Sequence, residues 1–206
     1  MPKMYIIAGC NGSGKTTASY SLLPEIFGQF DFVNSDEFAK SLSPFDPAAA
    51  SVAASRLMLI KTNYMLAHRK DFCVETTLAT RSLMKIISRA KTLGYEVTLL
   101  YFWLNSPELA IKRVHDRVVA GGHDIHEEVI RRRYIMGLAY FFDDYMQLVD
   151  KWILADNSKT PFSVVAEGTQ SETVVRDNAK YELIWWYAHP PGSEDGDDGD
   201  ISLQDK

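Results

Sequence analysis

The sequence has few cysteines and no long apolar run. Cys10 and Cys73 are the only cysteines among 206 residues, and neither lies in a C-x-x-C pair, which argues against a disulfide framework. The short apolar run in MPKMYIIAG breaks into glycines at once, so it matches neither a signal peptide nor a membrane-spanning helix. We therefore expect a soluble, cytoplasmic protein that does not bind a membrane.

An excess of positive charge is also lacking. The formal net charge is −5, but the last fifteen residues, GSEDGDDGDISLQDK, hold six acids and one lysine, which leaves 21 basic and 21 acidic residues elsewhere. A neutral body argues against an extended nucleic-acid surface, although it allows a local cationic pocket. The acidic tail, 190–206, lacks apolar periodicity and is expected to be disordered.

Apolar runs of strand length alternate with segments of helical period, which is typical of a parallel sheet covered by helices. The predicted fold is therefore α/β, a three-layer sandwich with a mostly parallel sheet of about five strands, in a single domain over 1–189. Strands are expected at 4–9, 30–36, 72–76 and 96–104, with short edge strands at WILADN and FSVVAEG. Helices are expected from Gly14 towards Leu23 and at about 48–68, 82–93, 107–121, 127–150 and 173–187.

The segment GCNGSGKT, residues 9–16, matches the phosphate-loop pattern G-x-x-x-x-G-K-[ST] between a buried strand and a helix. Such a loop turns successive N–H groups towards a phosphate, and the helix N-terminus adds partial positive charge. Lys15 is expected to reach the β- and γ-phosphates, and Thr16 to offer its hydroxyl to Mg²⁺. The nucleotide, ATP or GTP, would be held by Gly9, Asn11, Gly12, Ser13, Gly14, Lys15, Thr16 and Thr17.

Other motifs narrow the class of P-loop NTPase. The chain lacks the N-K-x-D motif of GTPases and the L-S-G-G-Q signature of transporter ATPases, and it is too short for the extra domains of a helicase. A small phosphotransferase remains, with both substrates bound over the carboxyl ends of the strands.

Carboxylates follow two of the predicted strands. Asp36, in NSDEF, is predicted to be the base that accepts the proton of the attacking hydroxyl, with a helix cap as the alternative role. Glu75, in FCVET, is predicted to hold Mg²⁺ partly through water, or to bind the acceptor.

The residues after Glu75 are candidates to bind the acceptor. Thr76 and Thr77 offer hydroxyls, and Arg81 offers a charge that would pair with an anionic part of the acceptor. The alternative for these threonines, and for Thr80, is to cap the helix that follows.

Arg113 and Arg117 are four residues apart on a predicted helix and therefore share a face. They are predicted to close over the triphosphate from the side opposite Lys15 and to stabilise charge on the moving phosphoryl group. An ion pair with Asp116 or another acid is the alternative.

The segment GGHDIHEEVIRRRY, residues 121–134, first suggests a metal site, but a structural zinc site needs four ligands and no second cluster supplies them. The paired glycines instead predict the hinge of a lid over about 119–133, whose closure would exclude water. His123 or Asp124 is predicted to contact phosphate or acceptor in the closed state only. Arg131, Arg132 and Arg133 step round a helix by about 100° each, so only one or two reach inwards, and Arg131 and Arg132 are the candidates.

Together these segments resemble the zeta-toxin family of phosphate-loop kinases, and more closely its short branch of predicted ATPases or kinases. The matching pieces are AGCNGSGKTT, FVNSDEFA, FCVETTLATR, LGYEVTLLYFWLNSPELAIKRVHDRV, GGHDIHEEVIRRRY and ADNS, within residues 4–158. The resemblance implies a kinase with a helical lid. In it Asp36 matches the base, Lys15 the loop lysine, Glu75 and Thr77 the E-x-T motif, and Arg113 and Arg117 the lid arginines.

The resemblance also implies a nucleotide-sugar acceptor such as UDP-N-acetylglucosamine, and an antitoxin-like protein partner. This sequence departs from the characterised members by reading E-T-T in place of E-G-T, and by being considerably shorter. The leading hypothesis is a Mg²⁺- and ATP-dependent kinase that acts on a hydroxyl of a small, anionic metabolite. The alternatives are an ATP-binding module that regulates a protein partner, and a polynucleotide or nucleotide kinase.

Overall fold

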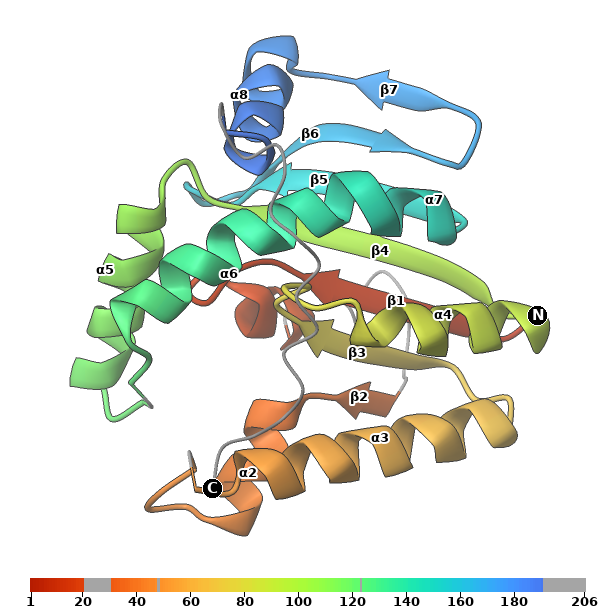
Figure 1. Ribbon diagram of the computed structural model, residues 1–206, viewed down its shortest axis with the longest axis vertical. Helices are drawn as coiled ribbons and strands as arrows, with labels where there is room; N and C mark the ends of the chain where they lie inside the picture. Colours follow the sequence, from red (N-terminus) through yellow and green to blue (C-terminus); the bar gives the residue numbers. More distant parts are fainter. Residues whose placement is uncertain (21–30, 48, 123, 191–206) are drawn as a thin grey trace.

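The computed structural model describes residues 1–20, 31–47, 49–122 and 124–190. Their strands form a seven-stranded sheet in the order β2-β3-β1-β4-β5-β6-β7 (Figure 1). The first five strands are parallel to one another, β6 is antiparallel to β5, and β7 is antiparallel to β6. The predicted mostly parallel α/β fold is confirmed. The strands are β1 (Lys3–Ala8), β2 (Asp31–Val33), β3 (Phe72–Thr76), β4 (Glu96–Trp103), β5 (Lys151–Asp156), β6 (Ser163–Gly168) and β7 (Thr173–Val175).

The central strand β1 is buried on both faces of the sheet. Met4, Ile6 and Ala8 belong to the larger hydrophobic core, while Tyr5 and Ile7 belong to a smaller core on the opposite face. Because successive side chains of a strand point to opposite faces, a strand covered on both sides reads as one continuous apolar run, as MYIIA does.

Helices cover both faces of the sheet. The larger core is completed by α3 (Ser51–Ala67), α4 (Ser82–Thr92), α6 (Glu127–Tyr140) and α8 (Asn178–Ala188), and Figure 1 shows α4 and α6 running across this face. On the other face, Ala18 of the helical residues 15–20 packs into the smaller core. The sheet therefore lies between two layers of helix, which is the predicted three-layer arrangement.

Three predicted boundaries were wrong. The second strand ends at Val33, because Asn34 accepts a hydrogen bond from Asp36 N (2.8 Å) and so caps α2 (Ser35–Leu42), where strand and loop had been expected. The expected helix over 127–150 is divided into α6, a π-helix (Phe141–Tyr145) and α7 (Met146–Leu148). Thr173–Val175 is a strand, since its β-branched residues favour the sheet edge, and α8 starts only after the cap Asp177.

The predicted lid region connects two helices. α5 (Pro107–Val119) has Ser106 as its N-cap, and its carboxyl end is closed by Gly121 N–H donating to Val118 O (2.9 Å). Gly121 has a φ of 88°, a left-handed conformation that glycine adopts without strain and that commonly ends helices. The paired glycines therefore form the turn between α5 and α6.

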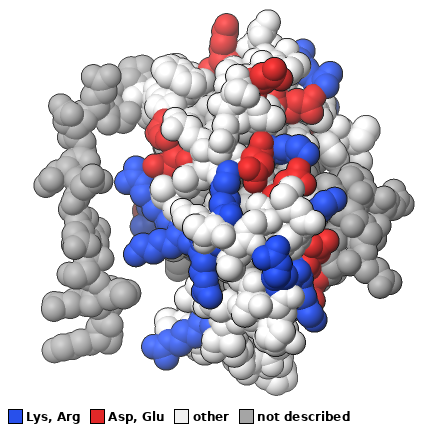
Figure 2. All heavy atoms as spheres, turned by 90° about the vertical axis from the view of Figure 1, so that its right-hand side faces the viewer, with Lys and Arg blue, Asp and Glu red and all other residues white. Residues whose placement is uncertain are grey.

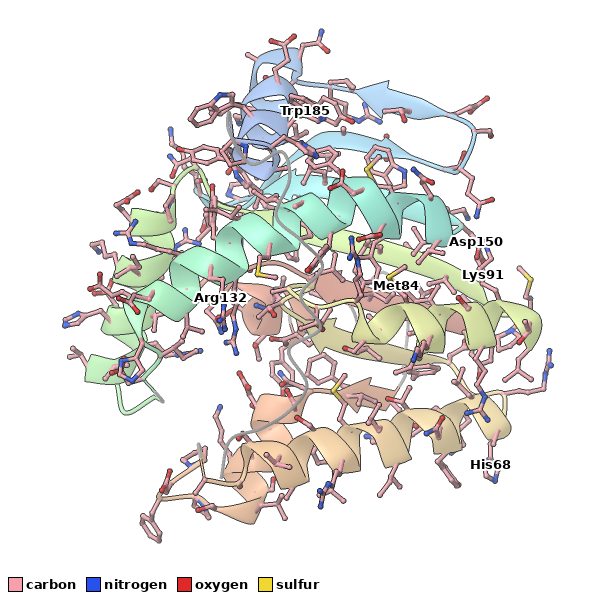
Figure 3. The ribbon with its side chains drawn as sticks, viewed as in Figure 1. His68, Met84, Lys91, Arg132, Asp150 and Trp185 are labelled. Atoms are coloured by element: carbon pink, nitrogen blue, oxygen red, sulfur yellow. The ribbon has the colours of Figure 1, made fainter. Side chains whose placement is uncertain are left out.

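The face at the amino ends of the parallel strands carries basic and acidic side chains interspersed (Figure 2). Lys91 and Asp150, which pair at 2.8 Å, lie at this end of the sheet, whereas Arg132 lies towards the opposite end (Figure 3).

Every helix in the described ranges is too short or too polar to cross a membrane. The acidic segment 191–206 and the predicted end of the first helix at Leu23 lie outside the described residues.

Candidate active site

The phosphate loop connects β1 to the helix that begins at Lys15. A Cβ at Gly12 would lie 2.6 Å from the carbonyl oxygen of Ala110 in α5, and a Cβ at Gly14 would overlap the side-chain amide of Asn157. Both glycines also have positive φ, 79° and 86°, which disfavours any side chain. The glycines therefore permit the loop to lie against α5 and against the segment that follows β5.

Lys15 and Glu75 lie at the base of this loop. Lys15 is 8% exposed and its ammonium donates to the carbonyl of Cys10 at 2.8 Å. Glu75, at the end of β3, is also 8% exposed. Burial lowers the pKa of the Lys15 ammonium and raises the pKa of the Glu75 carboxyl, while the attraction between the two opposite charges counteracts both shifts. The sheet register explains why Glu75 lies beside the loop. Glu75 is opposite Ile7 of β1, and the phosphate loop directly follows β1.

The hydroxyl of Thr16 donates to both oxygens of Glu75, at 2.9 Å and 3.0 Å. Both residues line the cavity described below, as do Thr76 and Thr77. The Thr76 hydroxyl accepts a hydrogen bond from Leu78 N (3.0 Å) and does not cap α4, so it fixes the turn after β3.

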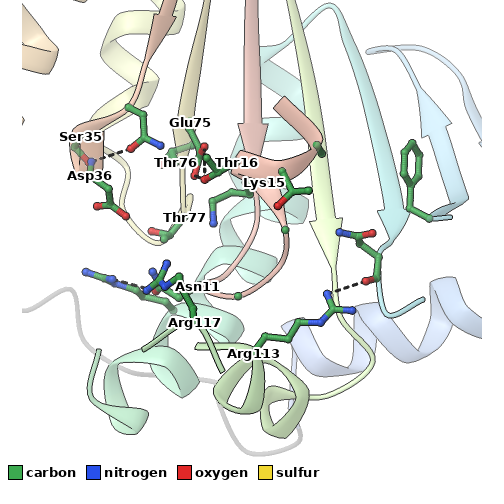
Figure 4. Close-up of a pocket in the computed structure, with 18 of the residues that line it drawn as sticks. Asn11, Lys15, Thr16, Ser35, Asp36, Glu75, Thr76, Thr77, Arg113 and Arg117 are labelled. Carbon is green, nitrogen blue, oxygen red and sulfur yellow. Dashed lines mark hydrogen bonds between the residues drawn. The ribbon is translucent and has the colours of Figure 1, made fainter. Parts of the chain in front are cut away.

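Asp36 lies in the first turn of α2 and not at the end of a strand. Its neighbour Asn34 supplies the cap, so the Asp36 side chain is not used for capping. Figure 4 shows the Asp36 carboxylate directed into the same space as Thr77 and Lys15. Glu37 instead pairs with Lys40 (3.2 Å).

Arg113 and Arg117 both line the cavity. Arg113 donates to the carbonyls of Asn157 (2.9 Å) and Ser158 (3.0 Å), so it connects α5 to the segment after β5 (Figure 4). The Asn157 amide in turn donates to Ser13 O in the phosphate loop at 2.7 Å. These contacts hold the loop, α5 and the end of β5 in one arrangement.

Arg133, and not the predicted Arg132, is the arginine of α6 that lines the cavity. Its guanidinium donates to Asn11 Oδ1 at 3.0 Å, whereas Arg132 is exposed. The reason is the position of Gly137, at which a Cβ would lie 2.7 Å from Thr77 O. This close approach sets which face of α6 meets the site, and residues 133 and 137 share that face.

Arg81 does not line the cavity. Its Nε donates to Asp144 at 3.0 Å, and its guanidinium lies over the Tyr140 ring with 4.9 Å to the centroid. Asp144 belongs to the π-helix, whose position the sequence did not indicate, so this prediction was wrong about the surroundings of Arg81. The predicted residue His123 lies outside the described residues.

The cavity has a volume of about 870 Å³ and lies over the carboxyl ends of β1, β2, β3 and β5. Gly9 and Ser13 belong to the phosphate loop but do not line the cavity. Sequence reasoning missed several lining residues, although ADNS, a polar group directly after an apolar strand, was a usable signal. The complete lining is Asn11, Gly12, Gly14, Lys15, Thr16, Thr17, Ala18, Asn34, Ser35, Asp36, Ser55, Met58, Glu75, Thr76, Thr77, Thr80, Ser82, Arg113, Arg117, Arg133, Asn157, Thr160, Pro161 and Phe162.

A phosphate loop after the central strand of a parallel sheet, opening into a cavity at the strand ends, defines a protein with the P-loop kinase fold. The family model described as "Zeta toxin" matches residues 1–150. The chain therefore belongs to the zeta toxin family.

One relative and several solved structures are similar to this chain. An uncharacterized protein of Haemophilus influenzae is 30% identical over 135 residues, which cover 64% of this chain and 92% of that protein. Among solved structures, the AvrRxo1-ORF1:AvrRxo1-ORF2 crystal structure with sulphate ions matches with a TM-score of 0.70 and 18% identity, over 89% of this chain and 63% of that one. This chain thus spans less than two thirds of the matched AvrRxo1 chain.

The PezAT chromosomal toxin-antitoxin system of Streptococcus pneumoniae matches with a TM-score of 0.64 and 16% identity, over 94% of this chain and 81% of that one. A gluconokinase from Sinorhizobium meliloti matches with a TM-score of 0.50 and 17% identity, over 77% and 84% of the two chains. At these identities the likeness concerns the fold.

Proposed function

We propose that this protein is a kinase that transfers the γ-phosphoryl group of ATP to a hydroxyl of a small metabolite. The observation that carries the proposal is one cavity that joins the phosphate loop, with Lys15 and the Thr16–Glu75 pair, to a carboxylate, Asp36, on the facing wall. Membership of the zeta toxin family and the likeness to P-loop kinases support it.

The loop would hold the triphosphate of ATP, or of GTP, through its N–H groups and Lys15. The nucleoside would extend towards Asn157 and Phe162, which line the cavity beyond Arg113. Arg117 and Arg133 lie on the helices that face the loop, where their charge would stabilise the moving phosphoryl group.

The side chains of Thr16 and Glu75 present only oxygen atoms, which are the ligands that Mg²⁺ prefers, so the pair fits this ion. Glu75 would hold the ion partly through water. When bound, Mg²⁺ supplies positive charge to the β- and γ-phosphate oxygens.

In the transfer, the acceptor oxygen forms a bond to the γ-phosphorus while the bond from that phosphorus to the β–γ bridging oxygen breaks, and ADP leaves. The acceptor hydroxyl loses its proton, and we assign Asp36 to accept it, because its carboxylate faces the cavity and does not cap α2. Thr76 and Thr77 would hydrogen-bond the acceptor.

Closure of the region 119–133 would complete the site. Its two flanking helices carry Arg117 and Arg133, and they are joined by the ion pair of Arg131 with Glu108 at 2.7 Å. Movement of the connection between these two helices about Gly121 would cover the phosphates beside both arginines and would exclude water. Replacement of His123 by alanine is expected to slow turnover without weakening ATP binding.

An antitoxin-like partner is the second candidate, because two similar structures, PezAT and AvrRxo1-ORF1:-ORF2, contain a second protein. In that case the protein would bind ATP and regulate its partner, and it would not phosphorylate an acceptor.

For the kinase, a UDP-amino-sugar is the acceptor suggested by the characterised family members.

The test is incubation of the purified protein with Mg-ATP and a metabolite extract, followed by mass spectrometry of phosphorylated products. The proposal expects an ATP-dependent product that Asp36→Asn abolishes. ATP binding and tight partner association without any product would favour the regulatory role. Oligonucleotide binding that weakens steeply with salt would favour a polynucleotide kinase.

A further inference from the structure

An ion pair outside the cavity lies behind the nucleotide side of the site. Asp156 is the last residue of β5 and is 9% exposed, and its Oδ2 accepts a hydrogen bond from the ammonium of Lys180 in α8 at 2.9 Å. Neither residue lines the cavity, although Asn157, directly after Asp156, does. The ion pair therefore contacts the site only through its neighbours.

The other oxygen of the Asp156 carboxylate shapes the turn after β5. Its Oδ1 accepts hydrogen bonds from the backbone N–H of Ser158 at 2.9 Å and from the Ser158 hydroxyl. An aspartate that accepts from the N–H two residues further on forms an Asx turn, which restrains the residue between them. The Ser158 hydroxyl also accepts from Asn105 N at 2.8 Å, so the turn is joined to the segment after β4. The Asp156 carboxylate thus holds the conformation of residues 157 and 158.

The turn at 157 and 158 contacts two parts of the nucleotide side. The carbonyls of Asn157 and Ser158 accept hydrogen bonds from the guanidinium of Arg113 at 2.9 Å and 3.0 Å (Figure 4). The Asn157 amide donates to Ser13 O at 2.7 Å, and a Cβ at Gly14 would lie 2.4 Å from the nitrogen of that amide. A shift of the turn would therefore displace the phosphate loop and Arg113 together.

The position of Lys180 is not explained by α8 itself. It lies in the first turn of the helix, after the N-cap Asp177, where the partial positive charge of a helix N-terminus disfavours a cation. Its ammonium is 2.9 Å from Asp156 and 3.7 Å from Asp177, so the shorter contact is the one with β5. The contact with Asp156, and not helix formation, accounts for a lysine at this position.

Both members of the ion pair are charged at neutral pH. Burial raises the pKa of the Asp156 carboxyl, but the hydrogen bonds from Ser158 and Lys180 outweigh burial, so the pKa lies below its ordinary value. The hydrogen bond to Asp156 raises the pKa of the Lys180 ammonium. Because Asp156 does not line the cavity, it is not a candidate for the base or for a metal ligand, and its charge acts through the turn.

We infer that Asp156 and Lys180 are positioning residues for nucleotide binding. Their ion pair fixes the turn at 157 and 158, and the turn holds the phosphate loop and Arg113 in the arrangement that receives the triphosphate. The inference rests on the nucleotide-binding part of the proposed function. It gives α8, which contributes no residue to the cavity lining, a role in ATP affinity.

The experiment measures binding of Mg-ATP and of inorganic tripolyphosphate with Mg²⁺ by isothermal titration. Lys180→Met removes the charge, and the side chain is 37% exposed, so the replacement is compatible with folding. It is expected to weaken both ligands by about tenfold, the lower end of the effect of losing a charged hydrogen bond. Equal losses are expected because the turn contacts the phosphate loop, which would hold the phosphates of both ligands. Lys180→Arg restores the charge and is expected to bind within about threefold of the original.

Lys151→Met is the matched control. Lys151 begins the same strand and pairs with Glu96 at 2.6 Å, so its replacement removes an ion pair at the opposite end of β5. Both affinities are expected to stay within about twofold, as for an exposed ion pair. The melting temperature of each variant is measured as well. A lower melting temperature for Lys180→Met with unchanged affinities would show that the pair is only structural, and would overturn the inference.

Asp156→Asn tests the other half of the pair. It is expected to weaken binding about as much as Lys180→Met, and the double variant little more than either, because both changes break the same contact. Additive losses would overturn the inference, as would a loss confined to ATP with tripolyphosphate binding unchanged. Failure of the original protein to bind either ligand would instead overturn the nucleotide-binding function together with the inference.

Discussion

The hydroxyl of Thr16 donates hydrogen bonds to both carboxylate oxygens of Glu75, across 59 positions of the sequence. The first residue is in the phosphate loop and the second is at the end of the neighbouring strand, so the contact joins the two elements that would share a metal ion. We expect Glu75→Gln to weaken Mg²⁺-dependent ATP binding about 10–100-fold, as loss of an outer-shell metal partner does. Isothermal titration with and without Mg²⁺ measures this.

Thr16→Ser keeps the hydroxyl and is the control, while Thr16→Val removes it. If the pair acts as one unit, the double variant Thr16→Val/Glu75→Gln is little worse than either single variant. Fully additive losses would show that the two residues act independently.

Asp36 and Glu37 are neighbours with different surroundings, which permits a matched test of the base. Asp36→Asn is expected to lower kcat by about 10²–10⁴-fold, because the proton acceptor is lost, with ATP affinity unchanged. Glu37→Gln breaks only the contact with Lys40 and is expected to keep normal turnover. Equal activity of both variants in a coupled ADP assay would remove Asp36 from the mechanism.

Arg132 and Arg133 provide a second matched pair. Arg133→Ala removes the charge-assisted hydrogen bond to Asn11, so we expect kcat/KM to fall by roughly 10–100-fold, the equivalent of the 1.5–3 kcal/mol of such a bond. Arg132→Ala, at an exposed position, is expected to stay within twofold. A larger loss of kcat/KM for Arg132→Ala than for Arg133→Ala would contradict the assignment of the Arg133 face of α6 to the site.

The pH dependence of nucleotide binding reports on Glu75. Burial raises the pKa of its carboxyl above the ordinary value of about 4.3. Since Mg²⁺ requires the ionised form, binding should be complete at high pH and lost on acidification through a midpoint above that value. Mg-ATP titrations across a pH series locate the midpoint. A midpoint at or below the ordinary value would contradict the predicted burial effect.

The two thiols are expected to be unreactive in the folded protein. Cys10 and Cys73 are 2% and 0% exposed, and burial raises the pKa of the Cys10 thiol to about 11 and that of Cys73 still further from its ordinary value. At pH 8 both thiols are therefore protonated as well as inaccessible. A chromogenic disulfide reagent should label neither before unfolding and both in denaturant. Rapid labelling of the native protein would contradict this.

Much of the fold was readable from local patterns. The run MYIIA predicted a central strand, and GCNGSGKT between strand and helix predicted the phosphate loop, because each pattern depends on neighbours in the sequence. The cap at Asn34 was the kind of signal that could have been read: an Asn before Ser-Asp-Glu predicts a helix start, and it would have moved Asp36 from a strand end to a helix.

The amino-acid sequence by itself established the phosphate loop, the mostly parallel α/β fold and the resemblance to the zeta toxin family, since these follow from motifs and periodicity within short segments. Only the tertiary structure decided that Arg133 faces the cavity and that Arg81 does not. Arg81 is paired with a residue 63 positions away, and Arg133 reaches an asparagine 122 positions away. Such choices depend on the rotation of α6, which is set by the close approach of Gly137 to Thr77, a contact between distant segments that no local pattern encodes.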